Sequence, residues 1–112
     1  MNDELFTMVE AEILDWPDVV VERGRFNSTT FLYGRREIGH IHVDGVADLP
    51  FSRAVRDELI SEGRAQPHRP GFPGWVSYYI RTPEDVPGAI ELFRTNYDRA
   101  KASAEQRGAS TA

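Results

Sequence analysis

The sequence predicts an α+β fold: a two-layer sandwich in which a mainly antiparallel sheet of four to five strands carries helices on one face. Two observations support this class. Apolar side chains recur at helical spacing near both ends of the chain, and short β-branched or aromatic runs separated by polar turns fill much of the length between them. The expected order of elements is α-β-β-β-α-(β)-β-α.

The first expected helix covers residues 3–16. Four apolar residues fall on one helical face, namely Leu5, Val9, Ile13 and Trp16. Pro17 disfavours helical geometry at the residue before it, so we expect the helix to end at Trp16.

Three strands are expected next, at residues 18–22, 29–33 and 37–43, because each run is rich in β-branched or aromatic side chains. Polar turn residues separate the first two runs, and Gly34 begins a tight connection to the third. The three runs therefore predict an antiparallel meander.

Side-chain alternation decides which face of this meander meets the helices. With a two-residue loop, odd positions of the second strand share a face with even positions of the third. One face then holds Thr29, Phe31, Tyr33, Ile38, His40 and His42. The other holds Thr30, Leu32, Gly39, Ile41 and Val43. We expect the second face to lie under the helices, because Gly39 permits close backbone approach; a β-bulge would exchange the pairing.

The second half of the chain is expected to alternate between helix and strand. Residues 48–50 lead into a helix over residues 51–62, and Gly63 can end that helix in the left-handed conformation. Residues 64–67 predict a short edge strand, and the proline- and glycine-rich residues 68–74 predict a loop.

The clearest strand pattern covers residues 75–81, where two sets of side chains alternate. A capping hydroxyl followed by proline then starts the last helix. Its apolar stripe consists of Val86, Ile90, Phe93 and Tyr97. Because the pattern fades after Ala100, we expect one domain over residues 1–100 and a flexible C-terminal tail over residues 101–112.

Composition limits the classes of function. The 112 residues carry a net charge of −5 and include no cysteine. Disulfides, thiolate metal sites and a cysteine nucleophile are therefore excluded, and no nucleic-acid partner is expected, since such partners usually require a basic face. No apolar run approaches the roughly 20 residues of a membrane span, and the N-terminus does not resemble a signal peptide. We expect a cytoplasmic protein without a membrane partner.

The strongest site signal is the pair His40 and His42. Residues i and i+2 of a strand point to the same face about 7 Å apart. Two imidazoles at that spacing can share a zinc or iron ion where further ligands converge. His68 is the available third ligand, and Asp44 is the other candidate.

A metal-free interpretation is the more conservative one: the two histidines form hydrogen bonds across the strands, for example with Thr29 or Tyr79, and no cofactor is held. Four aromatic residues are expected to line a surface beside the histidines that would suit a planar ligand. They are Phe31, Tyr33, Trp75 and Tyr79. Neither a nucleophile-elbow serine nor a phosphate-binding P-loop occurs in the sequence.

Three segments carry a resemblance to a known family. They read GRREIGHIHVDGVADLPF, VRDELISEGRAQPH and GWVSYYIRTPEDVPGAIELF. In that order they resemble the small stand-alone proteins of the luciferase domain family, over residues 16–100. The family name implies light-emitting oxidation, but flavin-dependent bacterial luciferase is a (β/α)₈ barrel of roughly 250 residues, which this chain cannot form. A weaker resemblance links the chain to small α+β domains of the YjbR type, sometimes described as DNA-binding.

Two hypotheses of function follow. In the first, a non-enzymatic domain binds a small molecule or a protein through the open sheet face and the loop over residues 68–74. In the second, a metal-assisted hydrolase or oxidoreductase holds an ion with His40, His42 and His68, and uses Asp44 or Glu37 as base. Whether the chain is an enzyme, and whether it acts as a monomer or a homodimer, stays open at this point.

Overall fold

Six antiparallel strands form one open sheet in the computed structural model, within the residues that it describes, 3–24, 28–68 and 70–111. The strands are β1 (Val19–Arg23), β2 (Thr29–Tyr33), β3 (Arg36–Ile41), β4 (Val46–Pro50), β5 (Gln66–Pro67) and β6 (Trp75–Tyr79). The helices are α1 (Asp3–Leu14), α2 (Arg53–Ser61), the short η2 (Pro83–Asp85) and α3 (Val86–Thr111). The predicted α+β class is confirmed, with more strands than the four to five expected.

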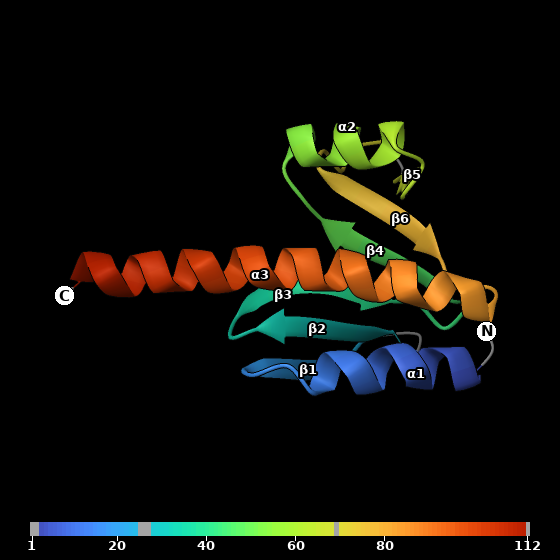
Figure 1. The fold of residues 1–112 in the computed structure, drawn as a ribbon, viewed down its shortest axis with the longest axis horizontal. Coiled ribbons are helices and arrows are strands. Elements are labelled where there is room, and N and C mark those ends of the chain that lie inside the picture. The colour runs from blue at the N-terminus through green and yellow to red at the C-terminus, as the bar shows by residue number, and fades with distance from the viewer. Residues whose placement is uncertain (1–2, 25–27, 69, 112) are drawn as a thin grey trace.

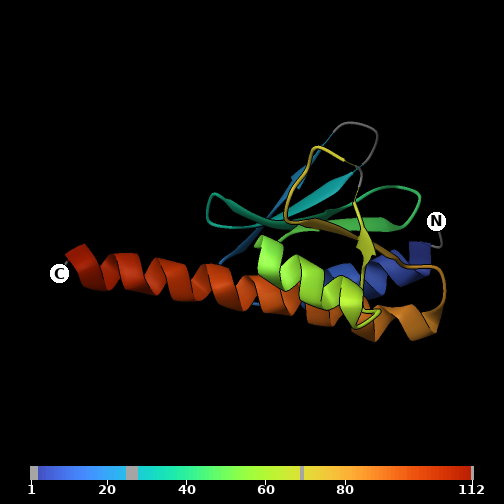
Figure 2. The same cartoon turned by 90° about the horizontal axis from the view of Figure 1, so that it is seen from above.

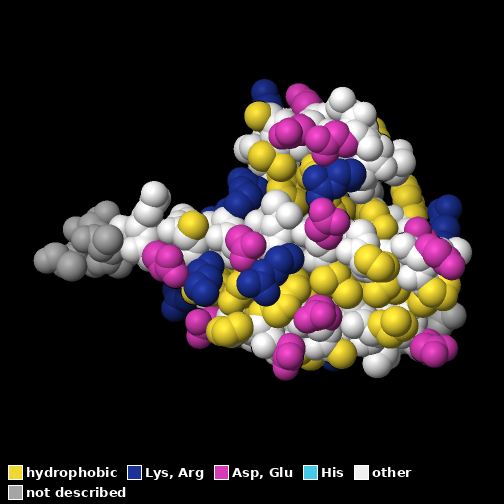
Figure 3. All heavy atoms as spheres, in the orientation of Figure 1, with side chains coloured by type: hydrophobic (Ala, Val, Ile, Leu, Met, Phe, Trp, Pro, Cys, Tyr) yellow, Lys and Arg dark blue, Asp and Glu magenta, His cyan; other side chains and the backbone are white. Residues whose placement is uncertain are grey.

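The helices cover one face of the sheet and leave the other face open (Figures 1 and 2). Helix α3 crosses β2, β3 and β4, α1 packs beside α3 and β1, and α2 packs on β6. Figure 3 shows this helix-covered face, on which charged side chains are scattered and none of the described histidines comes into view. The hydrophobic core lies between the two layers.

Strand β4 is the element that the sequence pattern missed. Residues 48–50 were expected to lead into a helix, but Val46–Pro50 pairs with β3 on one side and with β6 on the other. A tight turn makes this possible: Gly45 has a φ of 90°, and the carboxylate of Asp44 accepts a hydrogen bond of 3.1 Å from the N–H of Val46. The resulting strand order is β1-β2-β3-β4-β6-β5.

The C-terminal helix is also longer than predicted. Helix α3 continues to Thr111, and its last turns project beyond the sheet (Figure 1). Residues 101–107 are mainly Ala, Lys, Glu, Gln and Arg, which favour helix even without an apolar face. The domain boundary at residue 100 and the flexibility of residues 101–112 stay predictions. Residues 1–2, 25–27, 69 and 112, on which parts of the predicted turn, loop and tail fall, lie outside the described chain.

A β-bulge in β3 changes which face of β2 meets the helices, so that the face predicted to be open is the covered one. The ladder pairs Phe31 with Gly39 but Leu32 with Glu37, so Ile38 is an extra residue. Gly39 and Ile41 lie under the helices, as predicted. The prediction for β2 was wrong: Phe31 packs edge-on against Phe93, and Tyr33 against Tyr97, with ring centroids 5.5 Å apart in both pairs. Val43 is exposed, in the turn after β3.

Helix α3 holds this bulge in place. The extra residue leaves the carbonyl of Ile38 outside the regular ladder, and the fully buried Asn96 donates its Nδ2–H to that oxygen at 2.9 Å. At the next residue, a Cβ on Gly39 would come within 2.5 Å of the Phe93 ring. Only glycine permits α3 to pack this closely on β3.

Among the described residues, none of the helices combines the length and the apolar character needed to cross a membrane.

Replacing Asn96 by leucine should lower the free energy of unfolding by about 1–3 kcal/mol, because a buried carbonyl loses its donor. Urea denaturation followed by circular dichroism measures the change. Thr95→Ala is the control. Among the described residues, the Thr95 hydroxyl bonds only to the Glu91 carbonyl on the exposed side of α3, so its removal should change stability by less than about 0.5 kcal/mol. Equal stability of Asn96→Leu and the unmodified protein would contradict the role given to this bond.

Candidate functional site

A hollow of about 570 Å³ lies on the open face of the sheet, over β3, β4 and β6. All three histidines of the chain line it, together with acidic, hydroxyl and aromatic side chains. The lining residues are His40, His42, Asp44, Val46, Asp48, Pro67, His68, Phe72, Trp75, Ser77 and Tyr79. The structure therefore brings the three histidines together on the face where the sequence placed the candidate site.

Asp48 lies at the centre of this group although only 3% of it is exposed. Strand pairing places it directly between His40 of β3 and Ser77 of β6. The Ser77 hydroxyl donates to Asp48 Oδ1 at 2.7 Å, and His42 Nε2–H donates to Oδ2 at 2.7 Å. Asp48 is thus a buried carboxylate satisfied by neighbours on both sides.

His40 bridges two carboxylates. Its Nε2 lies 3.4 Å from Asp48 Oδ2, and its Nδ1 lies 2.5 Å from Glu37 Oε2. In a regular strand, residues 37 and 40 would point to opposite faces, so the bulge at Ile38 is what brings Glu37 to the ring of His40. The ring of His42 packs edge-on against that of His40, with centroids 4.8 Å apart.

His68 approaches the same carboxylate from the loop over residues 68–74. Its Nδ1 lies 3.3 Å from Asp48 Oδ1 and 3.0 Å from Ser77 Oγ. Because the Ser77 proton goes to Asp48, the hydroxyl oxygen accepts the Nδ1–H of His68. The ring also packs edge-on against Phe72, with centroids 5.2 Å apart.

These contacts control two pKa values. Burial lowers the pKa of His40, but the hydrogen bonds and charges of Asp48 and Glu37 outweigh it and raise the pKa to about 9. Burial alone would raise the pKa of Asp48; the hydrogen bonds from His40, Ser77 and His42 and the charge of His68 instead hold it well below its ordinary value. At neutral pH the centre of the site is a charged imidazolium paired with a charged carboxylate.

Three of these residues could hold a metal ion. One donor atom each from His40, His42 and Asp48 lies within 4.8 Å of the other two. His68, predicted as the third ligand, lies next to Asp48 but outside this set, and Asp44 lines the rim of the hollow while its carboxylate holds the turn before β4. A serine–histidine–aspartate relay does not fit, since Ser77 and Asp48 both approach the same nitrogen of His68.

The structure separates the four predicted aromatic residues. Trp75 and Tyr79 line the hollow, and the Trp75 ring lies 5.6 Å from that of His40. Phe31 and Tyr33 are on the other side of the sheet, because the bulge turned their strand face toward the helices. The metal-free interpretation had named Thr29 and Tyr79 as hydrogen-bonding partners of the histidines, whereas the bonds go to Asp48, Glu37 and Ser77.

Asp48 and Ser77 were missed by the sequence interpretation. Asp48 had been assigned to a helix entry, which gives a carboxylate no reason to face a histidine. Recognising residues 46–50 as a strand beside the His40-Ile41-His42 run would have placed Asp48 on the same face. Ser77 shares its face with Trp75 and Tyr79 in the alternating pattern of β6, so the signal for it was present.

In protein freed of metal, the imidazole of His40 should titrate near pH 9 instead of 6.5. Because the folded-state pKa is raised, the stability that this group contributes is complete below pH 6.5 and is lost as the pH rises through 9. NMR titration of the ring protons measures the midpoint, with His40→Gln to identify the resonance. Asp48→Asn should lower the midpoint; a value at or below 6.5 in the unmodified protein would contradict the arrangement.

Comparison with known proteins gives one match. No curated protein and no solved structure matches the chain. The family model described as Luciferase domain matches residues 35–96, more than half of the chain. The matched stretch runs from the start of β3 into α3, and it contains the whole histidine–aspartate cluster and Asn96. The chain therefore belongs to the Luciferase domain family.

Proposed function

We propose that this domain binds a small molecule in the hollow on its open sheet face, through a divalent transition-metal ion held by His40, His42 and Asp48. The observation that carries the proposal is the convergence of two imidazole nitrogens and one buried carboxylate within 4.8 Å. Imidazole and carboxylate ligands suit zinc and iron, and a set of three protein ligands leaves coordination positions for a substrate or water.

Glu37 gives independent support. Histidines that bind metals usually donate their second ring nitrogen to a carboxylate, which fixes the ring and makes the ligating nitrogen more basic. Glu37 occupies this position on Nδ1 of His40, and so leaves Nε2 directed toward Asp48. Glu37 therefore serves as an orienting group instead of the base considered from the sequence.

The distances fit a site that closes on an ion. Bonds of about 2.0–2.2 Å place neighbouring donor atoms about 3–3.5 Å apart around a metal. The nitrogens of His40 and His42 lie 3.4 Å and 2.7 Å from Asp48 Oδ2, and all three donor atoms lie within 4.8 Å of one another. The widest pair must therefore close by up to about 1.3–1.8 Å, and the 2.7 Å pair must open by about 0.3–0.8 Å. The ion would replace a proton on His40, so binding releases protons and tightens as the pH rises.

The walls of the hollow favour a small organic molecule as the bound partner. Trp75, Phe72 and Tyr79 provide aromatic surface above a floor of polar groups, an arrangement typical of small-molecule sites. An ion at the floor would polarise an oxygen of the bound molecule or activate a water, which is the chemistry of a metal-assisted hydrolase or oxidoreductase. Asp44, at the rim, is the available base.

A second candidate is a metal-free, non-enzymatic binding domain that uses the same hollow. It is supported by the saturation of the cluster: within the described part of the chain, every buried side-chain nitrogen and oxygen has a hydrogen-bond partner. When both its ring nitrogens are protonated, His40 already links Glu37 and Asp48 without an ion. A cytoplasmic location without a nucleic-acid partner, inferred from the charge of −5 and the absence of cysteine, completes either proposal.

Metal binding by untagged protein tests the proposal. Elemental analysis of the purified protein and calorimetric titration with Zn²⁺, or with Fe²⁺ under anaerobic conditions, should give one ion per chain. His42→Ala and Asp48→Asn should weaken binding by more than about 100-fold, and Glu37→Gln, which removes only the orienting group, by about 10- to 100-fold.

Asp44→Asn is the matched control, since it removes one carboxylate from the same hollow without touching the proposed ligands; its affinity should stay within about threefold. Folded protein that takes up neither ion would leave the metal-free candidate in place. Equal losses in Asp44→Asn and Asp48→Asn would show that general electrostatic attraction, not coordination, holds the ion.

A further inference from the structure

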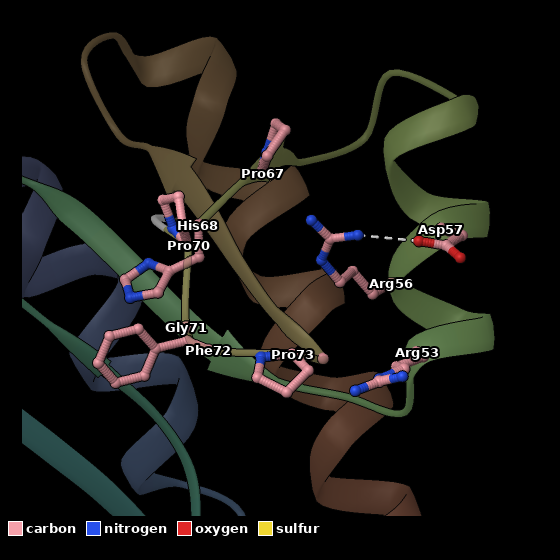
Figure 4. A pocket seen from close by; sticks show the side chains of 10 residues that line it. Arg53, Arg56, Asp57, Pro67, His68, Pro70, Gly71, Phe72 and Pro73 are labelled. Atoms are coloured by element: carbon pink, nitrogen blue, oxygen red, sulfur yellow. Dashed lines mark hydrogen bonds and ion pairs between the residues drawn. The ribbon is translucent and has the colours of Figure 1, made fainter.

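A second cavity, of about 690 Å³, lies between α2 and the loop over residues 68–74 (Figure 4). It shares Pro67, His68 and Phe72 with the hollow described above, so the loop forms a wall of both. The charged side chains of α2 that line it are two arginines and one aspartate, a net positive wall in a chain whose net charge is −5.

The two arginines are available to a ligand. The side chain of Arg53 makes no hydrogen bond or ion pair with any residue of the described chain. Within the residues that the structure describes, the guanidinium of Arg56 pairs only with its sequence neighbour Asp57, at 2.9 Å, and that carboxylate is largely exposed. Figure 4 shows both guanidinium groups extending from α2 toward the loop, on the same side of the helix.

The opposite wall is mainly apolar. The loop residues described there are Pro70, Gly71, Phe72, Pro73 and Gly74. Its end is fixed to the start of α2, because the N–H of Phe51 donates to the Gly74 carbonyl at 2.8 Å. A Cβ at Gly74 would come within 2.2 Å of the Phe51 oxygen, and the φ of 89° also requires glycine there. The Gly74 end of the loop is therefore held beside the residues that lead into α2.

We infer that this cavity binds an anionic group, a phosphate or a carboxylate, between Arg53 and Arg56 of α2 and the apolar loop wall. Guanidinium groups bind such anions with strong, directional hydrogen bonds, and a partly enclosed site strengthens them. Since Phe72 and the prolines provide apolar surface beside the arginines, we expect an organic anion to bind more tightly than a free one. The site does not depend on a metal in the neighbouring hollow.

The test uses the metal-free 112-residue chain, titrated with inorganic phosphate and with phenyl phosphate, and followed by the backbone amide shifts of Gly71, Phe72 and Gly74 and by calorimetry. Arg53→Gln should weaken binding at least about tenfold, and the double change Arg53→Gln/Arg56→Gln should abolish it. Tighter binding of phenyl phosphate identifies an organic anion as the ligand, and equal binding identifies the free anion.

Arg64→Gln is the matched control. It makes the same change in charge just beyond the other end of α2, where Arg64 already pairs with Glu62 and Glu91, so affinity should change by less than about twofold. Absence of binding by the unmodified protein, or an equal loss in Arg64→Gln and Arg53→Gln, would overturn the inference. Because Zn²⁺ binding is measured separately, either proposal can fail without the other.

Discussion

The candidate site depends on one extra residue in β3. Because Ile38 interrupts the ladder, Ile38 and Ile41 can both enter the core while Glu37, His40 and His42 face the other way. A regular strand would send Glu37 to the helix side and leave the Nδ1 of His40 without its carboxylate. The bulge persists because Asn96 satisfies the carbonyl that it frees. A hydrogen bond from the helical layer thus supports the bulge that brings Glu37 beside His40 on the open face.

The burial of the Asp48 carboxylate carries a desolvation cost. A carboxylate with 3% exposure loses most of its hydration, a loss that hydrogen bonds and opposite charge must offset. Here the compensation comes from Ser77 and three imidazole rings, all directed at one group from three separate chain segments. A core built for stability alone could use apolar residues at these positions. Such concentrated, strongly perturbed titratable groups in a hollow are typical of functional sites.

The sequence was sufficient to predict those features of the fold that depend on a local residue pattern. Alternation predicted β6, and it placed His40 and His42 together on the open face; Gly63, with a φ of 72°, ends α2 as expected. It was insufficient where the outcome depends on distant contacts. The bulge requires Asn96, which is 58 residues away from Ile38, so the face of Phe31 and Tyr33 could not be deduced from β2 and β3 alone. Strand β4 was missed because its five residues end in proline and are stabilised by neighbours on both sides.

The loop over residues 68–74 gives the two cavities opposite electrostatic character. On one side, the loop borders the hollow in which His40, His42 and Asp48 offer donor atoms for the proposed metal ion. On the other side, it faces Arg53 and Arg56, the proposed anion-binding residues. Consider a molecule with a metal-binding oxygen at one end and an acidic group at the other. It could place the oxygen in the first cavity and the acidic group in the second in only one orientation. Because Pro70 and Pro73 restrict φ in the loop and Gly74 is hydrogen-bonded to Phe51, the protein would lose less conformational entropy in making that match than with an unrestrained loop. Under the two proposals, this loop would therefore orient the ligand as well as connect β5 to β6.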